Sequence, residues 1–268
     1  MWRLTCALAA AFAALATLMP AAARAATVDL GKLANAETTL PDGSASAVVF
    51  LFSPAAGIGS EERGIARALR LGGAAVVTVD LPRTLEALDE EGDDCLYLVD
   101  DLERIGHEIG RQTGATQFRA PVLAGQGAGG ALVIDLLAQT PEATLGAVVA
   151  VDPDLGSRLA RPLCTPAERV STPAGQRYVL PKGPLPAPLT VIESEAMDPA
   201  GQARVLAMTG EGTTFALEHA AKAPGPALLD GIDKALAALE ADTSGLPLTE
   251  LPAKATRDTL AVVLSGDG

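Results

Sequence analysis

The stretch Gly125-Gln126-Gly127-Ala128-Gly129-Gly130 decides how this chain is interpreted. It follows an apolar run at residues 120–124 and precedes a helix-like run at residues 131–139. A strand, a glycine-rich turn and a helix form the setting of the G-x-S-x-G motif, whose serine is a nucleophile held on a sharp turn. The outer glycines of that motif, Gly125 and Gly129, are present, but Gly127 stands between them and carries no reactive group. The sequence therefore predicts a nucleophile elbow, residues 125–129, that has no nucleophile.

Apolar runs alternate with helical segments along most of the chain. The predicted strands cover residues 47–52, 74–79, 120–124, 146–151, 189–193 and 213–218, with a short one at 177–180. The predicted helices cover residues 60–71, 84–114 with a break at 92, 131–139, 199–208 and 228–239. Continuous apolar strands are typical of a parallel sheet buried on both faces. This alternation predicts an α/β fold, a mostly parallel sheet flanked by helices, and with the elbow it predicts an α/β-hydrolase-like architecture.

Both ends of the chain differ in composition from the middle. Arg3, an apolar run at residues 4–18 and Ala23-Arg24-Ala25 predict a cleaved signal peptide over residues 1–25, hence export to the bacterial periplasm. An anchor that stays in the membrane is the alternative, although a spanning helix needs about 20 apolar residues.

We expect one domain over residues 26–241, then a proline- and glycine-containing linker at 242–259. Residues 260–268 repeat the pattern of residues 47–57, an apolar strand followed by a serine and a glycine loop. They predict the first strand of a truncated second domain, or a strand that pairs with an edge of the same sheet.

Charge and composition exclude several functions. Lys and Arg number 20 against 33 Asp and Glu, and the net charge of −13 repels nucleic-acid phosphates. Aromatic residues make up only 3%, too few for base-stacking platforms.

Cys95 and Cys164 would remain in the exported chain, where an oxidising compartment favours one disulfide; two separately buried thiols are the alternative. Two histidines and no C-x-x-C spacing speak against a structural zinc site, and no metal or cofactor is predicted.

Two downstream residues follow the order of a hydrolase triad, in which the nucleophile precedes the acid and the acid precedes the histidine. Asp198 follows the strand at 189–193, and His219 follows the strand at 213–218. Gly127, Asp198 and His219 are therefore interpreted as a vestigial triad without its first member. The alternative is that Asp198 caps the helix beginning at Pro199 and that His219 is an ordinary loop histidine.

A serine hydrolase that uses another nucleophile is the first alternative function. Ser53 follows the first buried strand, and a serine esterase or lipid hydrolase could use it as a nucleophile if a base lay beside it. Without such chemistry, the elbow is expected to edge a binding pocket formed by Ser53, Gly125, Gln126, Gly127, Ala128 and Gly129.

A dinucleotide site is the second alternative. Gly125, Gly127 and Gly130 match G-x-G-x-x-G between a strand and a helix, and Asp152 ends the following strand where a ribose-binding acid would lie. Against this, the fingerprint normally occupies the first βα turn, whereas two predicted strands precede it here.

Several segments resemble the N-terminal half of the AcvB/VirJ family of bacterial periplasmic virulence proteins. They are residues 53–57, 93–101, 123–131 and 161–164, and residues 264–268 are similar to the opening of that family's second, VirJ-type half. The resemblance implies an exported, two-module α/β-hydrolase-like protein associated with lysyl-phosphatidylglycerol hydrolysis and type IV secretion. Its implied partners are a second VirJ-type domain of the same polypeptide, secretion-system proteins or a lysyl-lipid ligand. The family's serine-dependent chemistry belongs to the VirJ-type half, so the resemblance transfers no catalytic residue to this chain.

Overall fold

The computed structural model describes residues 28–33, 35–90, 92–116 and 118–243. The strands are β1 (Ala36–Thr39), β2 (Ala47–Phe52), β3 (Ala74–Val79), β4 (Val122–Gln126), β5 (Ala147–Val151), β6 (Arg169–Thr172), β7 (Gly175–Tyr178), β8 (Leu189–Ser194) and β9 (Ala216–Ala220). The helices are α1 (Ser60–Leu71), α2 (Leu81–Asp89), α3 (Val99–Thr113), α4 (Ala128–Leu136), α5 (Pro199–Glu211) and α6 (Pro224–Thr243), with 3₁₀ turns η1 (Gly31–Leu33) and η2 (Leu137–Gln139). The expected signal peptide, most of the linker and residues 260–268 lie outside the described residues.

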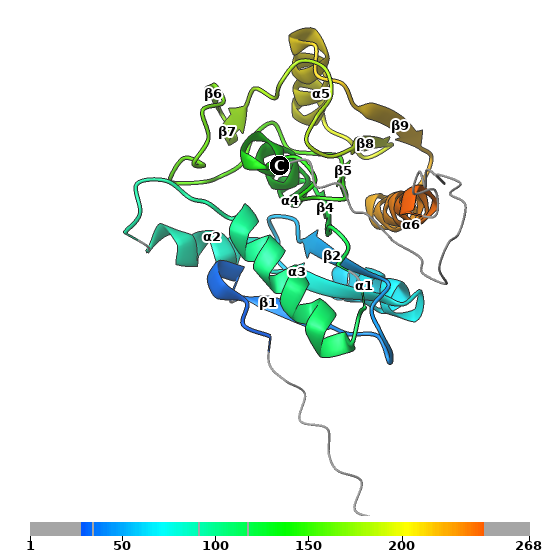
Figure 1. The fold of residues 1–268 in the computed structure, drawn as a ribbon. Coiled ribbons are helices and arrows are strands. Elements are labelled where there is room, and N and C mark those ends of the chain that lie inside the picture. The colour runs from blue at the N-terminus through cyan, green and yellow to red at the C-terminus, as the bar shows by residue number, and fades with distance from the viewer. Residues whose placement is uncertain (1–27, 34, 91, 117, 244–268) are drawn as a thin grey trace, which may run out of the picture.

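Seven strands form one twisted sheet in the order β1-β3-β2-β4-β5-β8-β9. The edge strand β1 runs antiparallel to β3, and every other pair in this sheet is parallel. The strands β6 and β7 form a separate antiparallel hairpin. The predicted α/β-hydrolase-like fold, with a mostly parallel sheet flanked by helices, is confirmed, and β4 lies at its centre (Figure 1).

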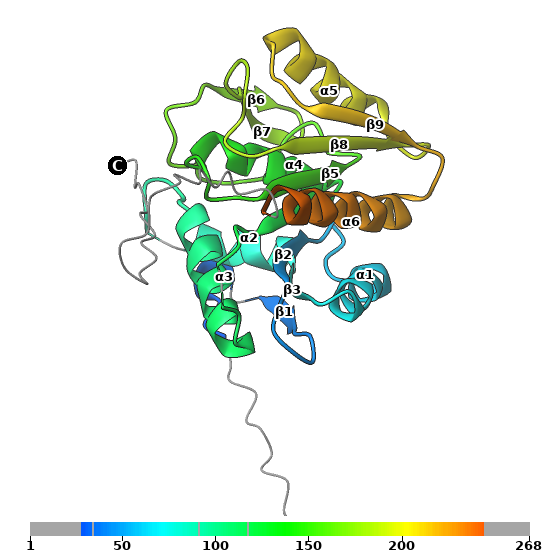
Figure 2. The same ribbon diagram turned by 45° about the vertical axis from the view of Figure 1, so that its right-hand side comes forward.

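Helices cover both faces of the sheet, which explains why the inner strands β2, β3 and β5 are apolar and buried, whereas the edge strands β1 and β9 are partly exposed. Side chains on β2 alternate between two cores: Phe50 belongs to the core that includes side chains of α2, α3, α4 and α5, whereas Leu51 belongs to the core that includes side chains of α1 and α6. Figure 2 shows α1 and α6 on one side of the strands and α3 on the other. Both layers are needed because each strand buries side chains in both directions.

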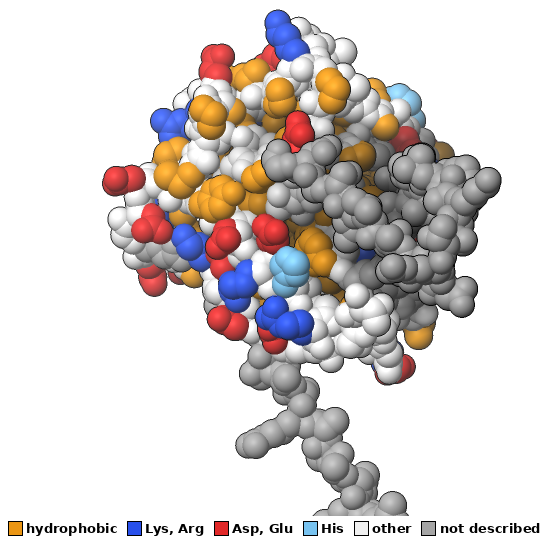
Figure 3. Space-filling model, viewed as in Figure 1, with side chains coloured by type: hydrophobic (Ala, Val, Ile, Leu, Met, Phe, Trp, Pro, Cys, Tyr) orange, Lys and Arg blue, Asp and Glu red, His pale blue; other side chains and the backbone are white. Residues whose placement is uncertain are grey.

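The structure differs from the predictions in where some elements begin and end. The helical segment predicted at 84–114, with a break at 92, is two helices as expected, but the interruption is longer than predicted: α2 ends at Asp89 and α3 begins at Val99. Residues 93 and 94 are not helical. Acidic, basic and hydrophobic side chains are interspersed on the face of the molecule that contains α2 and α3 (Figure 3).

Candidate functional site

The elbow has the backbone geometry of a nucleophile turn. Gly127 joins β4 to α4 with φ 53° and ψ −119°, a backbone conformation that residues other than glycine adopt only under strain. Its N–H donates to the Val151 carbonyl at 3.0 Å, and its carbonyl accepts from the N–H groups of Asp154 and Ala131 at 3.0 and 2.9 Å. The turn is therefore held from β5 and from α4, with no side chain at the position that a nucleophile would occupy.

The flanking glycines are required by packing. A Cβ atom on Gly129 would lie 2.4 Å from the Phe52 carbonyl oxygen, and one on Gly125 would lie 2.5 Å from the carbonyl carbon of Gly129. A Cβ on Gly130 would lie 3.1 Å from the Gly125 carbonyl oxygen. The first turn of α4 thus packs directly against the backbones of β2 and β4, which accounts for the glycine pattern without a bound phosphate.

Asp152, the expected ribose-binding acid of the dinucleotide alternative, is used inside the fold. Its Oδ1 accepts from the Ser194 N–H at 2.8 Å, and its Oδ2 accepts from the Ser194 hydroxyl at 2.5 Å. These bonds tie the ends of β5 and β8 together. This arrangement favours a structural role for Asp152.

Ser53 lies at the end of β2, but its hydroxyl does not face a cleft. The residue is fully buried, its Oγ accepts from the Leu81 N–H at 3.0 Å, and it donates to the Pro54 carbonyl at 3.2 Å. Its own N–H donates to the Val79 carbonyl at 3.0 Å. These contacts give Ser53 the function of holding the loop after β2 against the start of α2.

The two candidate triad residues have other partners. Asp198 is the N-cap of α5, and its Oδ1 accepts from the Gly201 N–H at 2.7 Å. His219 lies within β9 rather than after it, and its exposed imidazole has Nδ1 3.0 Å from Oε2 of Glu193 on the neighbouring strand. The carboxylate in contact with His219 is thus that of Glu193, which sequence reasoning missed because the pairing depends on the register of β8 and β9.

Gln126 and Ala128, on either side of Gly127, face different surroundings. The Gln126 side-chain amide donates to Glu61 and Glu62 at 3.2 Å each, which links the elbow to the start of α1. Ala128 instead lines a cleft of about 100 Å³ beside the elbow. Besides Ala128, the cleft is lined by Ala55, Leu81, Pro82, Leu85, Leu132, Ser157 and Arg158. Most of these lining residues are apolar, and Arg158 is exposed.

Asp154 is the titratable group beside Gly127, and the sequence analysis did not single it out. Its Oδ1 would be 3.6 Å from a Cβ atom on Gly127. Burial raises the pKa of the Asp154 carboxyl, the negative charge of Asp198 raises it further, and Arg158 and Arg204 lower it. Asp154 could have been predicted from its position just after β5, because the loops that follow parallel strands all lie at the same edge of the sheet.

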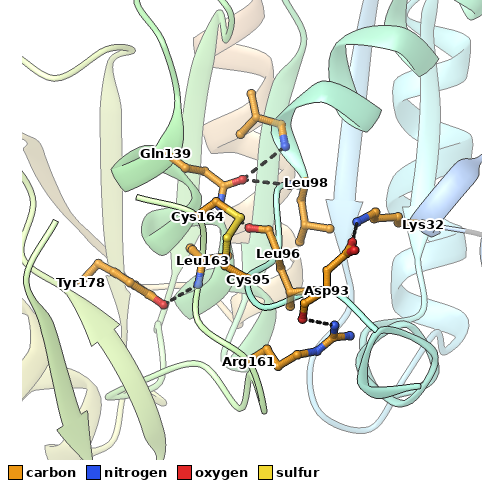
Figure 4. The surroundings of a disulfide bond; sticks show 11 residues. Lys32, Asp93, Cys95, Leu96, Leu98, Gln139, Arg161, Leu163, Cys164 and Tyr178 are labelled. Atoms are coloured by element: carbon orange, nitrogen blue, oxygen red, sulfur yellow. Dashed lines mark hydrogen bonds and ion pairs between the residues drawn. A yellow bond between two sulfur atoms is a disulfide. The ribbon is translucent and has the colours of Figure 1, made fainter. Parts of the chain in front are cut away.

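The expected disulfide between Cys95 and Cys164 is confirmed (Figure 4). It joins the loop between α2 and α3 to the loop that follows β5, with Cα atoms 5.1 Å apart. The Leu96 carbonyl accepts from the Cys164 N–H at 2.9 Å, and Oε1 of Gln139 accepts from the Leu98 N–H at 2.8 Å. Two loops distant in sequence are therefore held together beside the end of α4.

In the described part of the chain, no group of three or more His, Cys, Asp or Glu side chains is arranged to hold a metal ion. None of the helices over the same residues is both long and apolar enough to cross a membrane.

The chain is similar to known proteins only at the level of solved structures. No family model matches the chain, and no curated protein sequence matches it. Among solved structures, a candidate dienelactone hydrolase from Klebsiella pneumoniae is 16% identical with a TM-score of 0.49, over 76% of this chain and 92% of that one. Esterase PE8 is 14% identical with a TM-score of 0.45, over 77% and 98%. A dienelactone hydrolase from Anabaena variabilis is 18% identical with a TM-score of 0.43, over 78% and 90%. The likeness to these solved proteins concerns the fold alone.

Proposed function

We propose that this chain is a catalytically silent α/β-hydrolase-like module that binds a ligand or partner without cleaving it. The observation that carries the proposal is Gly127, which occupies the elbow with the geometry of the turn and without a reactive side chain. Knocking out the nucleophile of a catalytic triad lowers kcat by about 10⁶-fold, so the loss of this one group is sufficient to silence such a site.

The other polar groups at this edge of the sheet support the same proposal. The Ser53 hydroxyl is buried and hydrogen-bonded, Asp198 caps a helix, and His219 contacts Glu193. Each therefore has a partner within the protein that needs no substrate. The interpretation of Gly127, Asp198 and His219 as a vestigial triad remains part of the proposal.

The cellular setting is proposed from the resemblance to the AcvB/VirJ family. On that basis the module is exported to the periplasm and works beside a second, VirJ-type domain that performs the chemistry. Lysyl-phosphatidylglycerol hydrolysis and type IV secretion are the processes with which it would be associated. The disulfide agrees with an oxidising compartment.

An esterase assay tests the silent-module proposal. The purified protein is expected to hydrolyse p-nitrophenyl butyrate and lysyl-phosphatidylglycerol no faster than the same protein after heat denaturation. It should also remain unlabelled by a fluorophosphonate. Turnover that Ser53→Ala abolishes would show an active serine hydrolase and would refute the proposal.

Gly127→Ser provides the matched variant: its Cβ would make only an ordinary 3.6 Å contact with Asp154, although the positive φ of 53° would strain the backbone of the variant. If the remaining groups are a vestigial triad, the restored hydroxyl should gain fluorophosphonate labelling. A folded variant that stays unlabelled would contradict the vestigial triad. It would not contradict the proposal that the natural chain is catalytically silent.

A further inference from the structure

A groove of about 430 Å³ lies at the amino edge of the sheet, at the opposite ends of the strands from the elbow. Ala47, the first residue of β2, lines it together with residues 118–120, which precede β4, and Gly146, which precedes β5. Its walls come from the C-terminal parts of α1 and α6, two helices on the same side of the sheet (Figure 2). The groove is therefore separate from the cleft at the elbow.

The groove is lined mostly by apolar residues. Leu69 comes from α1, and Leu236, Ala237 and Leu239 come from α6. Phe118 also lines it and is 46% exposed, so a large apolar side chain is left partly in water. On α6 the lining positions 233, 236, 237 and 240 are three or four residues apart, so they form one stripe along the helix. A stripe with apolar residues at its centre is typical of a helix face that packs against another segment.

The segment that follows α6 supplies apolar side chains next to this groove. Residues 246–252 lie outside the described residues, and their sequence is Leu246-Pro247-Leu248-Thr249-Glu250-Leu251-Pro252. An extended chain spans at most about 3.6 Å per residue, so these leucines all lie within about 30 Å of Thr243, where α6 ends. Glu240, which lines the groove, is less than one helical turn before that end. The segment is thus held near the groove at an effective concentration on the order of millimolar.

The groove and the segment match in size and in charge. A cavity of about 150 Å³ accommodates a benzene ring, so about 430 Å³ has room for about three groups of leucine size. The charged residues that line the groove are two acids and one base, Asp233, Glu240 and Arg119. Residues 246–257 carry the opposite balance, with Lys254 and Arg257 against Glu250. This complementarity favours the segment over one with the charge balance of the groove itself.

We propose that the groove binds residues 246–252 of the same chain, with the leucine side chains against Phe118 and the apolar stripe of α6. Pro247 and Pro252 restrict the backbone of the unbound segment, which lowers the entropy lost when it binds. The linker is then a fixed connection, and the residues that follow it leave the module at the amino edge of the sheet, away from the elbow. This inference goes beyond the silent-module proposal and does not depend on whether the elbow is active.

Cleavage by the protease Glu-C tests the inference, because Glu250 lies between Leu248 and Leu251. A bound segment must leave the groove before it is cut, so the rate of cleavage follows the fraction of molecules in which it is released. We expect the full chain to be cut at Glu250 at least about tenfold more slowly than a synthetic peptide of residues 244–257. Equal rates would overturn the inference.

Two neighbouring substitutions on α6 assign the protection to the groove. Ala237→Arg places a long charged side chain in the groove and should speed cleavage at Glu250 at least about tenfold. Ala238→Arg is the matched control, because Ala238 is also exposed on α6 but does not line the groove, and it should leave the rate unchanged. Arginine has a high helix propensity, so both variants should retain α6, and cleavage at the exposed Glu90 should be the same in all three proteins. If Ala237→Arg is cut as slowly as the natural chain, the segment does not lie in the groove.

Further variants identify what fills the groove. Leu248→Ser with Leu251→Ser should abolish the protection, measured against a peptide that carries the same changes, whereas Leu260→Ser with Leu264→Ser should leave it unchanged. Loss of protection in the second pair alone would show that the apolar run at 260–264 fills the groove. Protection should also be independent of protein concentration, and protection that disappears on dilution would show that the segment binds a second copy of the chain. Either result would overturn the inference.

Discussion

Asp135 shows how one buried carboxylate organises several elements. It is fully buried in α4, and its Oδ1 lies 2.7 Å from Nη2 of Arg204, which is also buried. Its Oδ2 accepts from the Ser157 hydroxyl at 2.5 Å, and its Oδ1 accepts from the Tyr178 N–H at 3.2 Å. A single side chain thus connects α4 to α5, to the loop after β5 and to β7.

Removing this carboxylate should be strongly destabilising. Asp135→Ala would leave the Arg204 charge buried without its partner, and we expect the free energy of unfolding to fall by about 3–5 kcal/mol in urea titrations. Glu37→Ala is the control, since it breaks the half-exposed pair with Arg63 and should cost at most about 1 kcal/mol. Equal losses in the two variants would contradict this assignment.

At the scale of an element, the start of α4 depends on the absence of side chains. Gly129→Ala would place a Cβ atom against the carbonyl oxygens of Phe52 and Ser53, at 2.4 and 2.6 Å. Because those are backbone atoms, the helix itself must shift, and we expect a loss of about 1–3 kcal/mol in the free energy of unfolding.

The matched control for this prediction is Gly210→Ala in α5, where a Cβ atom would meet nothing within 4 Å. Helix propensity should make that variant more stable, by up to about 1 kcal/mol. Thermal unfolding of the pair measures the difference. If Gly129→Ala is as stable as the natural protein, the close approach of α4 to β2 is not essential.

At the scale of the whole molecule, the disulfide connects loops separated by 69 residues. Cys95→Ser together with Cys164→Ser should lower the free energy of unfolding by about 4 kcal/mol, since the unfolded chain regains the entropy of an open loop. The natural protein, unfolded without reductant, should contain no titratable thiol from this pair. Dithiothreitol should destabilise the natural protein and leave the double variant unchanged; equal sensitivity would refute a stabilising disulfide.

The architecture of the sheet could be predicted from local patterns. The apolar runs at Ala47–Phe52 and Ala74–Val79 became β2 and β3 with unchanged bounds, because strands buried on both faces are apolar from end to end. Polar segments were harder to bound. The predicted strand at 213–218 is β9 at Ala216–Ala220, since its exposed side chains give little periodic signal.

The sequence by itself determined the α/β-hydrolase-like fold, the glycine elbow and the two cysteines that pair. Apolar periodicity, glycine spacing and cysteine content are properties of single segments or of composition, so they can be read without coordinates. Only the tertiary structure placed Asp154 beside Gly127, Glu193 beside His219 and Arg204 beside Asp135. These neighbours come from segments whose proximity depends on strand order and register, which no local pattern encodes.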